Sequence, residues 1–187
     1  RLKLDRPECG PTGWCYVMFY EAYGNWASTL PRFSSEADGE RDIWESPFPE
    51  TGAANWVADE ALRRGYVFET VLGVVPRYPK KGSRPMYGGA VEYAPDGKVN
   101  YFVSDSPVVS RTDESGVWKA LNAGAPIFWL FISPVGDHGE PRLPVYTCWY
   151  GPARDTYLSN DPFCEPLKYP GVLPSNRAPL GFAITSE

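Results

Sequence analysis

A short motif that recurs three times constrains the fold of this chain more than any other feature. Each copy has an aromatic residue, an apolar residue and then Ser-x-x-Pro. The three copies are Trp26–Pro31, Phe102–Pro107 and Tyr157–Pro162, with the shared serine at Ser28, Ser104 and Ser159. A recurring motif of this kind indicates a unit that buries its apolar face only against neighbouring copies of itself.

The sequences that flank the motif agree as well. An aromatic, strand-like run precedes each copy, and a second strand-like run follows it. The matching runs are Trp14–Tyr16, Pro85–Tyr87 and Pro144–Tyr146 before the motif, and residues 125–133 and 178–186 after it. Residues 61–65 also match 120–124, where Gly65 and Gly124 would end a short helix in the left-handed conformation. We therefore expect three degenerate repeats, at about 9–76, 84–134 and 143–187, within a single domain spanning 1–187.

Composition favours short strands joined by turns. The chain has 20 prolines and 18 glycines, which interrupt helices, and 7 Trp, 12 Tyr and 9 Phe residues, which suit pleated surfaces. Pro95-Asp96-Gly97 predicts a hairpin turn, and Gly88-Gly89 predicts a bulge. The sequence thus predicts a mostly β, β-trefoil-like fold around a pseudo-threefold axis, with a short helix in the first and second repeats. The alternative is an α+β arrangement.

The repeat unit resembles a family of secreted bacterial and fungal repeat proteins of unknown function. The family's units contain Pro-Val-Tyr-Arg, His-Phe-Tyr-Thr and Gly-Tyr-x-x-Glu-Gly runs, which Ala61–Glu69, Pro144–Cys148 and Leu180–Phe182 resemble. The family's histidine is replaced here by Asn25, Tyr101 and Thr156, so any function that needs an imidazole there would be lost. Such units often accompany cell-wall or polysaccharide-acting enzymes. The resemblance implies attachment or binding.

Four cysteines bear on the compartment. They stand at Cys9, Cys15, Cys148 and Cys164, without a C-x-x-C pair and with one histidine, His138, which argues against a zinc site. The short sequence gaps favour Cys9–Cys15 and Cys148–Cys164 disulfides, although three connectivities are formally possible. Disulfides imply a secreted or extracellular protein.

Charge and motif content exclude several classes of function. The net charge of −5 gives no attraction to nucleic acid, and no run of about 20 apolar residues predicts a transmembrane segment. No phosphate-binding glycine loop occurs, and we expect no cofactor and no metal. His138 lies in a predicted surface turn, so schemes based on a catalytic histidine find little support.

The acidic segment 34–60 offers the main enzymatic alternative. Paired carboxylates can hydrolyse glycosidic bonds. The candidates in this segment are Glu36, Asp38, Glu40, Asp42, Glu45, Asp59 and Glu60. Because they alternate with Ser, Gly and Arg, we interpret the stretch as a solvated loop and expect no catalytic residues there. The density of oxygen ligands also leaves a calcium site open.

Binding is the better use of the repeated aromatic residues. Aromatic rings stack on the apolar faces of sugars, and neighbouring amides and carboxylates bond the sugar hydroxyls. The candidate ligand-binding residues are Asn25, Trp26, Asn100, Tyr101, Asp105, Asp155, Tyr157 and Asn160. We therefore expect a secreted, non-catalytic module that binds a glycan or cell-surface polymer. The alternatives are a polysaccharide hydrolase that uses the 34–60 carboxylates and a self-assembling extracellular structural protein.

Overall fold

A computed structural model describes the part of the chain from which the fold follows. It gives the backbone of residues 3–4, 8–9, 15–16, 19–20, 27–35, 42–45, 67–76, 78–95, 97, 99–173 and 178–185. Within these ranges the side chains are described from Thr70 onward, apart from that of Ala153, and before Thr70 only for Leu30 and Arg32.

Strands dominate the described residues. They are β1 (Lys3–Leu4), β2 (Glu8–Cys9), β3 (Cys15–Tyr16), β4 (Phe19–Tyr20), β5 (Ala27–Ser35), β6 (Asp42–Glu45), β7 (Val67–Pro76), β8 (Ser83–Tyr93), β9 (Val99–Ser104), β10 (Arg111–Asp113), β11 (Gly116–Ala120), β12 (Phe128–Phe131), β13 (Arg142–Tyr150), β14 (Asp155–Ser159) and β15 (Gly181–Ile184). The prediction of a mostly β protein is confirmed.

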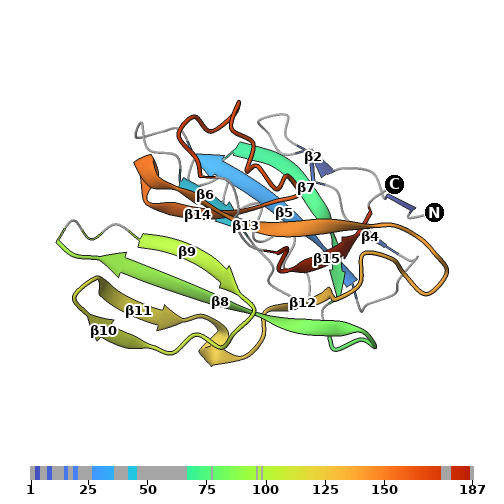
Figure 1. Ribbon diagram of the computed structural model, residues 1–187, viewed down its shortest axis with the longest axis horizontal. Coiled ribbons are helices and arrows are strands. Elements are labelled where there is room, and N and C mark those ends of the chain that lie inside the picture. Colours follow the sequence, from blue (N-terminus) through green and yellow to red (C-terminus); the bar gives the residue numbers. More distant parts are fainter. Residues whose placement is uncertain are drawn as a thin grey trace.

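Eleven of the strands form one open, antiparallel sheet. Its main path has the order β10-β11-β8-β12-β15-β7-β5-β6, while β9 pairs with β8, and β13 pairs with both β14 and β15. Two small ladders, β1–β4 and β2–β3, stand apart from it. Figure 1 shows β8 to β11 on one side of the molecule and β5, β7, β13 and β14 on the other, with β12 between them.

Strand β8 organises the sheet because it has partners along both edges. Residues 89–92 pair with β9 on one edge and with β11 on the other. The carbonyls of Gly88 and Met86 accept hydrogen bonds from Leu121 and Ile127, so β11 and β12 follow one another along the same edge. The β8–β9 ladder is continuous through Gly88 and Gly89, so the predicted bulge is wrong.

The second and third predicted repeats have the same strand-pairing registers. In each, a long strand pairs with the strand that ends at the motif serine and also with the closing strand. The corresponding pairs are Tyr87–Ser104 and Tyr146–Ser159, Met86–Phe128 and Val145–Gly181, and Pro85–Trp129 and Pro144–Phe182. In each comparison the paired residues of one predicted repeat are those that the sequence alignment matches with the paired residues of the other.

The first predicted repeat is paired differently. Ser28 lies opposite Val75 of β7, whereas Ser104 and Ser159 lie opposite tyrosines. Tyr16, which corresponds to those tyrosines, pairs with Glu8. The described strands therefore form an open sheet in which no threefold axis is visible.

Short turns occupy the described position of one expected helix. Residues 122–124 form a 3-10 turn, η2 (Asn122–Gly124), and a second one, η3 (Gly151–Ala153), follows β13. Gly124 has a left-handed φ of +81°, as predicted for this glycine. Asn122 and Ala123 also have positive φ values, of +48° and +51°, and Leu121 before them is extended, so the turn is left-handed throughout and no right-handed helix forms at these residues. The helix expected at 54–64, with Gly65, lies outside the described residues.

A single apolar cluster connects most of the strands. It joins residues from both halves of the sheet: Leu30, Leu72, Val75, Met86, Val103, Ile127, Phe128, Leu130, Val145, Leu158 and Ala183. Met86 of β8 and Val145 of β13 face it, and the residues on either side of each are half-exposed, as expected when successive side chains of a strand point to opposite faces. Along β7, residues 72–76 are all buried.

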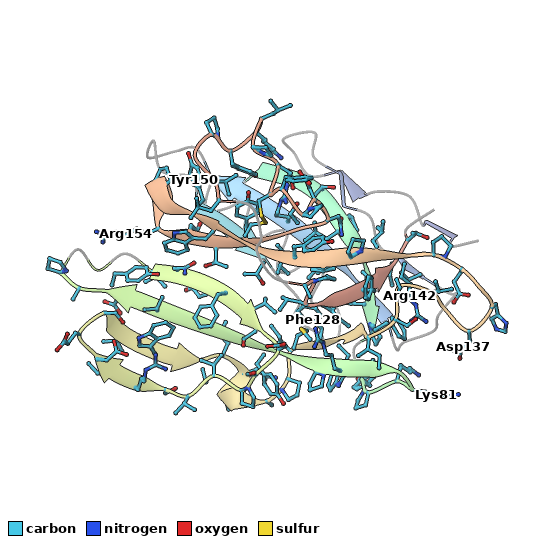
Figure 2. All side chains as sticks on the ribbon, in the orientation of Figure 1. Lys81, Phe128, Asp137, Arg142, Tyr150 and Arg154 are labelled. Atoms are coloured by element: carbon cyan, nitrogen blue, oxygen red, sulfur yellow. A yellow bond between two sulfur atoms is a disulfide. The ribbon has the colours of Figure 1, made fainter. Side chains whose placement is uncertain are left out.

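A second cluster forms around a disulfide, which Figure 2 draws as a yellow bond between two sulfur atoms. Cys148 and Cys164 are bonded, which confirms that predicted pair, and Tyr157, Tyr169 and Val172 pack beside them. The hydroxyl of Tyr157 donates a hydrogen bond to the carbonyl of Cys164 at 2.5 Å. The disulfide thus holds the loop after β14 against β13. Cys9 and Cys15 lie opposite one another in the β2–β3 ladder, and their side chains are outside the described set.

Candidate functional site

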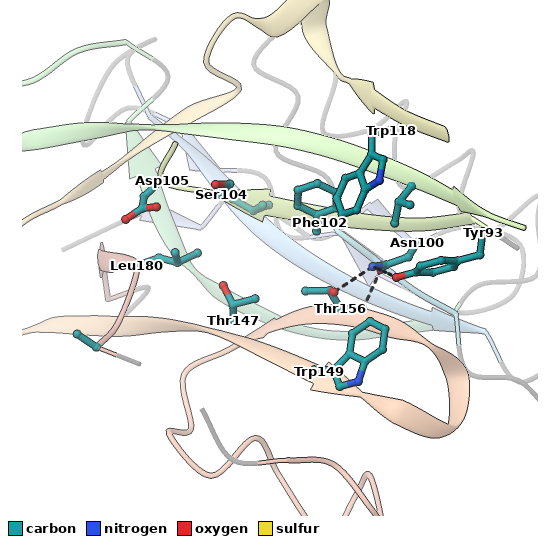
Figure 3. Close-up of a pocket in the computed structure, with 13 residues that line it drawn as sticks. Tyr93, Asn100, Phe102, Ser104, Asp105, Trp118, Thr147, Trp149, Thr156 and Leu180 are labelled. Atoms are coloured by element: carbon teal, nitrogen blue, oxygen red, sulfur yellow. Dashed lines mark hydrogen bonds between the residues drawn. The ribbon is translucent and has the colours of Figure 1, made fainter. Parts of the chain in front are cut away.

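A cleft opens where the β8–β9–β11 layer diverges from the β13–β14 hairpin. Its volume is about 380 Å³, within the range of small-molecule sites. The residues that line it are Val91, Tyr93, Asn100, Phe102, Val103, Ser104, Asp105, Trp118, Thr147, Trp149, Thr156, Ala178 and Leu180. Figure 3 shows the rings of Phe102 and Trp118 on one wall and Trp149 on the opposite wall.

Glycine creates the space for one aromatic wall. A Cβ atom added to Gly89 would lie 2.3 Å from the Phe102 ring, so the ring occupies the position that a side chain would take. Phe102 also makes an edge-to-face contact with Trp118, with ring centroids 5.7 Å apart. Such pairs are favourable, and this one fixes both rings before any ligand arrives.

Polar contacts hold Trp118 from the other side. The Arg111 guanidinium lies 4.3 Å from the Trp118 ring centroid, and the indole Nε1 donates to Asp113 Oδ1 at 3.2 Å. Hydrogen bonds from Ser115 and Arg111 hold the pKa of the exposed Asp113 carboxyl well below its usual range. Asp113 therefore stays ionised at neutral pH and keeps the indole oriented.

Asn100 bridges the seam between β9 and β14. Its Oδ1 accepts a hydrogen bond from the backbone N–H of Thr156 at 2.9 Å, and its Nδ2 donates to Thr156 Oγ1 at 3.1 Å. Nδ2 also lies 3.4 Å from the hydroxyl of Tyr93. Asn100 is 3 % exposed, and these contacts satisfy both ends of its amide. These hydrogen bonds join β9 to β14 and so close the cleft at the end nearest Tyr93.

Thr147 is the least satisfied polar group in the cleft. Its Oγ1 is buried and has no hydrogen-bond partner among the described residues. Figure 3 shows it between Leu180 and Trp149. Native proteins pair nearly all buried polar atoms, so a hydroxyl left without a partner in a cleft is suited to bonding a ligand.

One charged side chain, Asp105, is part of the lining. Its carboxylate is 46 % exposed and lies 3.6 Å from Arg84 Nη1. At the opposite wall, Trp149 is 37 % exposed, so an aromatic face is accessible to solvent. The cleft therefore combines accessible aromatic surface with hydroxyl, amide and carboxylate groups.

The structure brings some of the sequence-predicted ligand-binding residues together and separates others. Asn100 and Asp105 line the cleft, whereas Tyr101 is 40 % exposed and is not part of the lining. Asp155 is buried and accepts a hydrogen bond from the Thr156 N–H. Tyr157 is fully buried in the disulfide cluster.

The remaining predicted residues lie elsewhere. The amide of Asn160 donates to the carbonyls of Leu72 and Pro144, at 3.1 and 2.7 Å, and so joins β7 to β13. Asn25 and Trp26 lie outside the described residues. Of the acidic candidates for hydrolysis, Asp42 and Glu45 are placed in β6 by their backbone alone, and Glu36, Asp38, Glu40, Asp59 and Glu60 lie outside the described residues.

Sequence reasoning missed several residues of the cleft. They are Tyr93, Trp118, Thr147, Trp149 and Thr156. A signal for two of them was present, because Val145, Thr147 and Trp149 alternate along one strand and so face the same side. With Val145 in the core, this alternation predicts that Thr147 and Trp149 continue the inner face toward its open end.

Comparisons of the chain with models of protein families, with curated proteins and with solved structures gave no match. Among the described residues, no helix has the length and apolar character needed to cross a bilayer. The same residues contain no group of three or more potential metal ligands.

Proposed function

We propose that this protein is a secreted, non-catalytic module that binds a glycan in the cleft between β8–β9–β11 and β13–β14. The observation that carries the proposal is the buried hydroxyl of Thr147, which has no partner within the described part of the chain, beside the accessible ring of Trp149. Sugars need both kinds of contact, because each pyranose has an apolar C–H face and a rim of hydroxyl groups.

The fixed positions of the cleft residues support binding. Phe102, Trp118 and Asn100 are held by neighbours that do not depend on a ligand. A site that is ordered in advance loses little conformational entropy when it binds. The cleft is therefore suited to a ligand with many weak polar contacts.

The disulfide supports the extracellular setting. Cys148 and Cys164 are bonded, and structural disulfides persist in oxidising compartments. A glycan or cell-wall polymer is then a ligand that the protein would meet. This role agrees with the resemblance to secreted repeat proteins noted in the sequence.

Hydrolysis is the second candidate, and the cleft favours it less. Glycosidases use two carboxyl groups that flank the scissile bond, and Asp105 is the single carboxylate among the lining residues that the structure describes. No second carboxylate of the described lining residues could complete such a pair. We therefore place binding ahead of catalysis.

We also infer that residues 84–134 and 143–187 are two copies of one unit. Their shared pairing registers support this. The closing strands β12 and β15 pair with each other at Phe131–Phe182, a register that is symmetric about the aligned pair Leu130 and Ala183. A local twofold axis that relates these two copies accounts for the register. The first copy would extend the sheet formed by the two copies through β7, which pairs with β15, and β5, which pairs with β7.

A retention experiment tests the proposed function. The purified protein is mixed with insoluble cellulose, chitin and xylan, and the bound fraction is measured. We expect retention on at least one polymer, and Trp149→Ala should weaken it about tenfold through lost stacking. Tyr101→Ala is the matched control, because Tyr101 has a similar exposure (40 % against 37 %) but is not part of the lining.

The outcomes separate the candidate functions. Absence of retention on every polymer would contradict glycan binding, as would equal effects of the two substitutions. New reducing ends released from a retained polymer would contradict the non-catalytic role and favour hydrolysis. Elution of the protein as large assemblies from a sizing column would favour the structural alternative.

A further inference from the structure

Apolar residues of the cleft accompany a hydroxyl that has no partner among the described residues. Val103, Ala178 and Leu180 belong to the lining, and Figure 3 shows Leu180 and Thr147 at the end of the cleft that also holds Ser104 and Asp105. Val103 is 7 % exposed, and Leu180 packs against the main core. This end therefore offers an apolar surface directly beside a group that both donates and accepts hydrogen bonds.

The segment that carries Leu180 is held firmly in place. The backbone N–H of Leu180 donates to the carbonyl of Val145 at 2.8 Å. Arg84 Nη2 donates to the carbonyl of Leu180 and, at 3.3 Å, to that of Pro179. Because the backbone is tied at both of its polar groups, the Leu180 side chain has a fixed position in the cleft.

The charge of the lining disfavours acidic sugars. Asp105 is the charged residue among the described lining residues, whereas Arg84, whose Nη1 lies 3.6 Å from its carboxylate, is not part of the lining. A uronate or sulfate group bound here would meet a like charge, which is unfavourable in a partly desolvated site. An uncharged substituent on the sugar fits better.

We infer that the ligand carries an acetamido group, as in polymers of N-acetylhexosamine; this inference rests on the proposed glycan-binding function. The methyl of the acetamido group would contact Leu180 and Val103. Its amide would take the hydrogen bond that Thr147 Oγ1 lacks among the described residues. A sugar with a plain hydroxyl at that position could bond Thr147 but would leave the apolar surface uncovered.

Matched oligomers test the inference. Calorimetric titrations compare a tetramer of N-acetylglucosamine, the corresponding tetramer of glucose and the deacetylated tetramer of glucosamine. We expect the acetylated tetramer to bind about five- to tenfold more tightly than the glucose tetramer. An affinity ratio of this size corresponds to the free energy gained when one methyl group is buried with its contacts.

A substitution of Leu180 sharpens the test. Leu180→Ala should lower the preference for the acetylated tetramer to less than about twofold. The preference is the ratio of the affinities of the two tetramers, both measured with the same protein preparation. Partial unfolding of the variant lowers both apparent affinities by the same factor and leaves their ratio unchanged. Ile132→Ala is the control, because Ile132 is 61 % exposed and is not part of the lining; it should keep the preference.

Each outcome decides the inference. The expected preference, lost in Leu180→Ala and kept in Ile132→Ala, supports it. Equal binding of the acetylated and glucose tetramers overturns the acetamido inference and leaves glycan binding intact. Tighter binding of the glucosamine tetramer also overturns it and assigns the specificity to Asp105. Failure of all three to bind overturns it as well, and the polymer retention experiment then decides the proposed function separately.

Discussion

Arg32 and Glu165, 133 residues apart in the sequence, form a two-pronged ion pair. Arg32 Nη1 and Nη2 donate to Glu165 Oε1 and Oε2 at 2.7 and 2.8 Å. Arg32 is 1 % exposed, and its guanidinium also lies over the rings of Tyr157 and Tyr169, 5.6 and 5.8 Å from their centroids. The pair thus ties β5 to the loop that follows β14, which also contains Cys164.

The ion pair makes the free energy of unfolding vary with pH in the acid range. Burial by itself raises the pKa of Glu165, but hydrogen bonds from Arg32 and Ser159 and the charge of Arg32 outweigh it, and the pKa is lowered. A lowered pKa contributes stability above the unfolded value, about 4.3 for Glu, which is lost as the pH falls through the folded value. Glu165→Gln should therefore cost about 3 kcal/mol at pH 7, because it removes a paired negative charge from the buried guanidinium.

Urea unfolding of the wild type and Glu165→Gln at several pH values measures this effect. The difference in unfolding free energy should shrink as the pH falls below about 4, because Glu165 is then protonated in the unfolded state, and the loss is complete once the pH is also below the lower folded-state pKa. Glu92→Gln is the control, since Glu92 belongs to an exposed pair 3.7 Å from Lys119, and it should change stability little. A difference for Glu165→Gln that is the same at pH 7 and pH 2.5 would contradict the account.

The Cys148–Cys164 disulfide should contribute a stability of its own. It closes a loop with a sequence separation of 16, for which the expected contribution is about 3 kcal/mol. The double variant Cys148→Ala with Cys164→Ala should lower the free energy of unfolding by about that amount, and dithiothreitol should then have no effect through this bond. An unchanged unfolding midpoint in the double variant would show that the second cluster holds the loop without the disulfide.

Gly89 should be intolerant of even one added carbon. Gly89→Ala would place a Cβ atom 2.3 Å from Phe102, so the ring and its contact with Trp118 must shift, at a cost of about 1–3 kcal/mol. Near-ultraviolet circular dichroism should show the altered aromatic packing. Gly151→Ala is the control, because its added Cβ atom would meet the nearest atom at 3.7 Å. Equal unfolding free energies for the two variants would refute this packing role.

The order of strands in the second and third predicted repeats could be predicted from the sequence. Local patterns indicated a strand, a turn, a strand that carries the motif and a closing strand. The pairing registers, such as Tyr87–Ser104 and Tyr146–Ser159, were not predicted, because an alignment of copies gives equivalent positions and not cross-strand partners. Gly89 shows where the local pattern fails. The sequence predicted a bulge, but the missing side chain makes room for a ring that comes from the neighbouring strand.

Much of the candidate site depends on contacts between segments that are distant in the sequence. Asn100 was selected because it precedes an aromatic residue of the motif, yet its role follows from Thr156, 56 residues away. Tyr157 was selected in the same way, but it points into the disulfide cluster. Repeat alignment identifies equivalent positions, and it does not tell which face of each strand stays open.

The measurement that tests the cleft most directly combines stability and binding in one variant, Thr147→Val. Valine keeps the shape of threonine and removes the buried hydroxyl that lacks a partner among the described residues. Urea unfolding of the variant should give a free energy equal to that of the wild type or up to about 1 kcal/mol higher, because no desolvated polar group remains. Titration with the polymer or oligomer that the wild type retains should give an affinity roughly five- to tenfold lower. An affinity equal to that of the wild type would contradict the assignment of this cleft as the binding site.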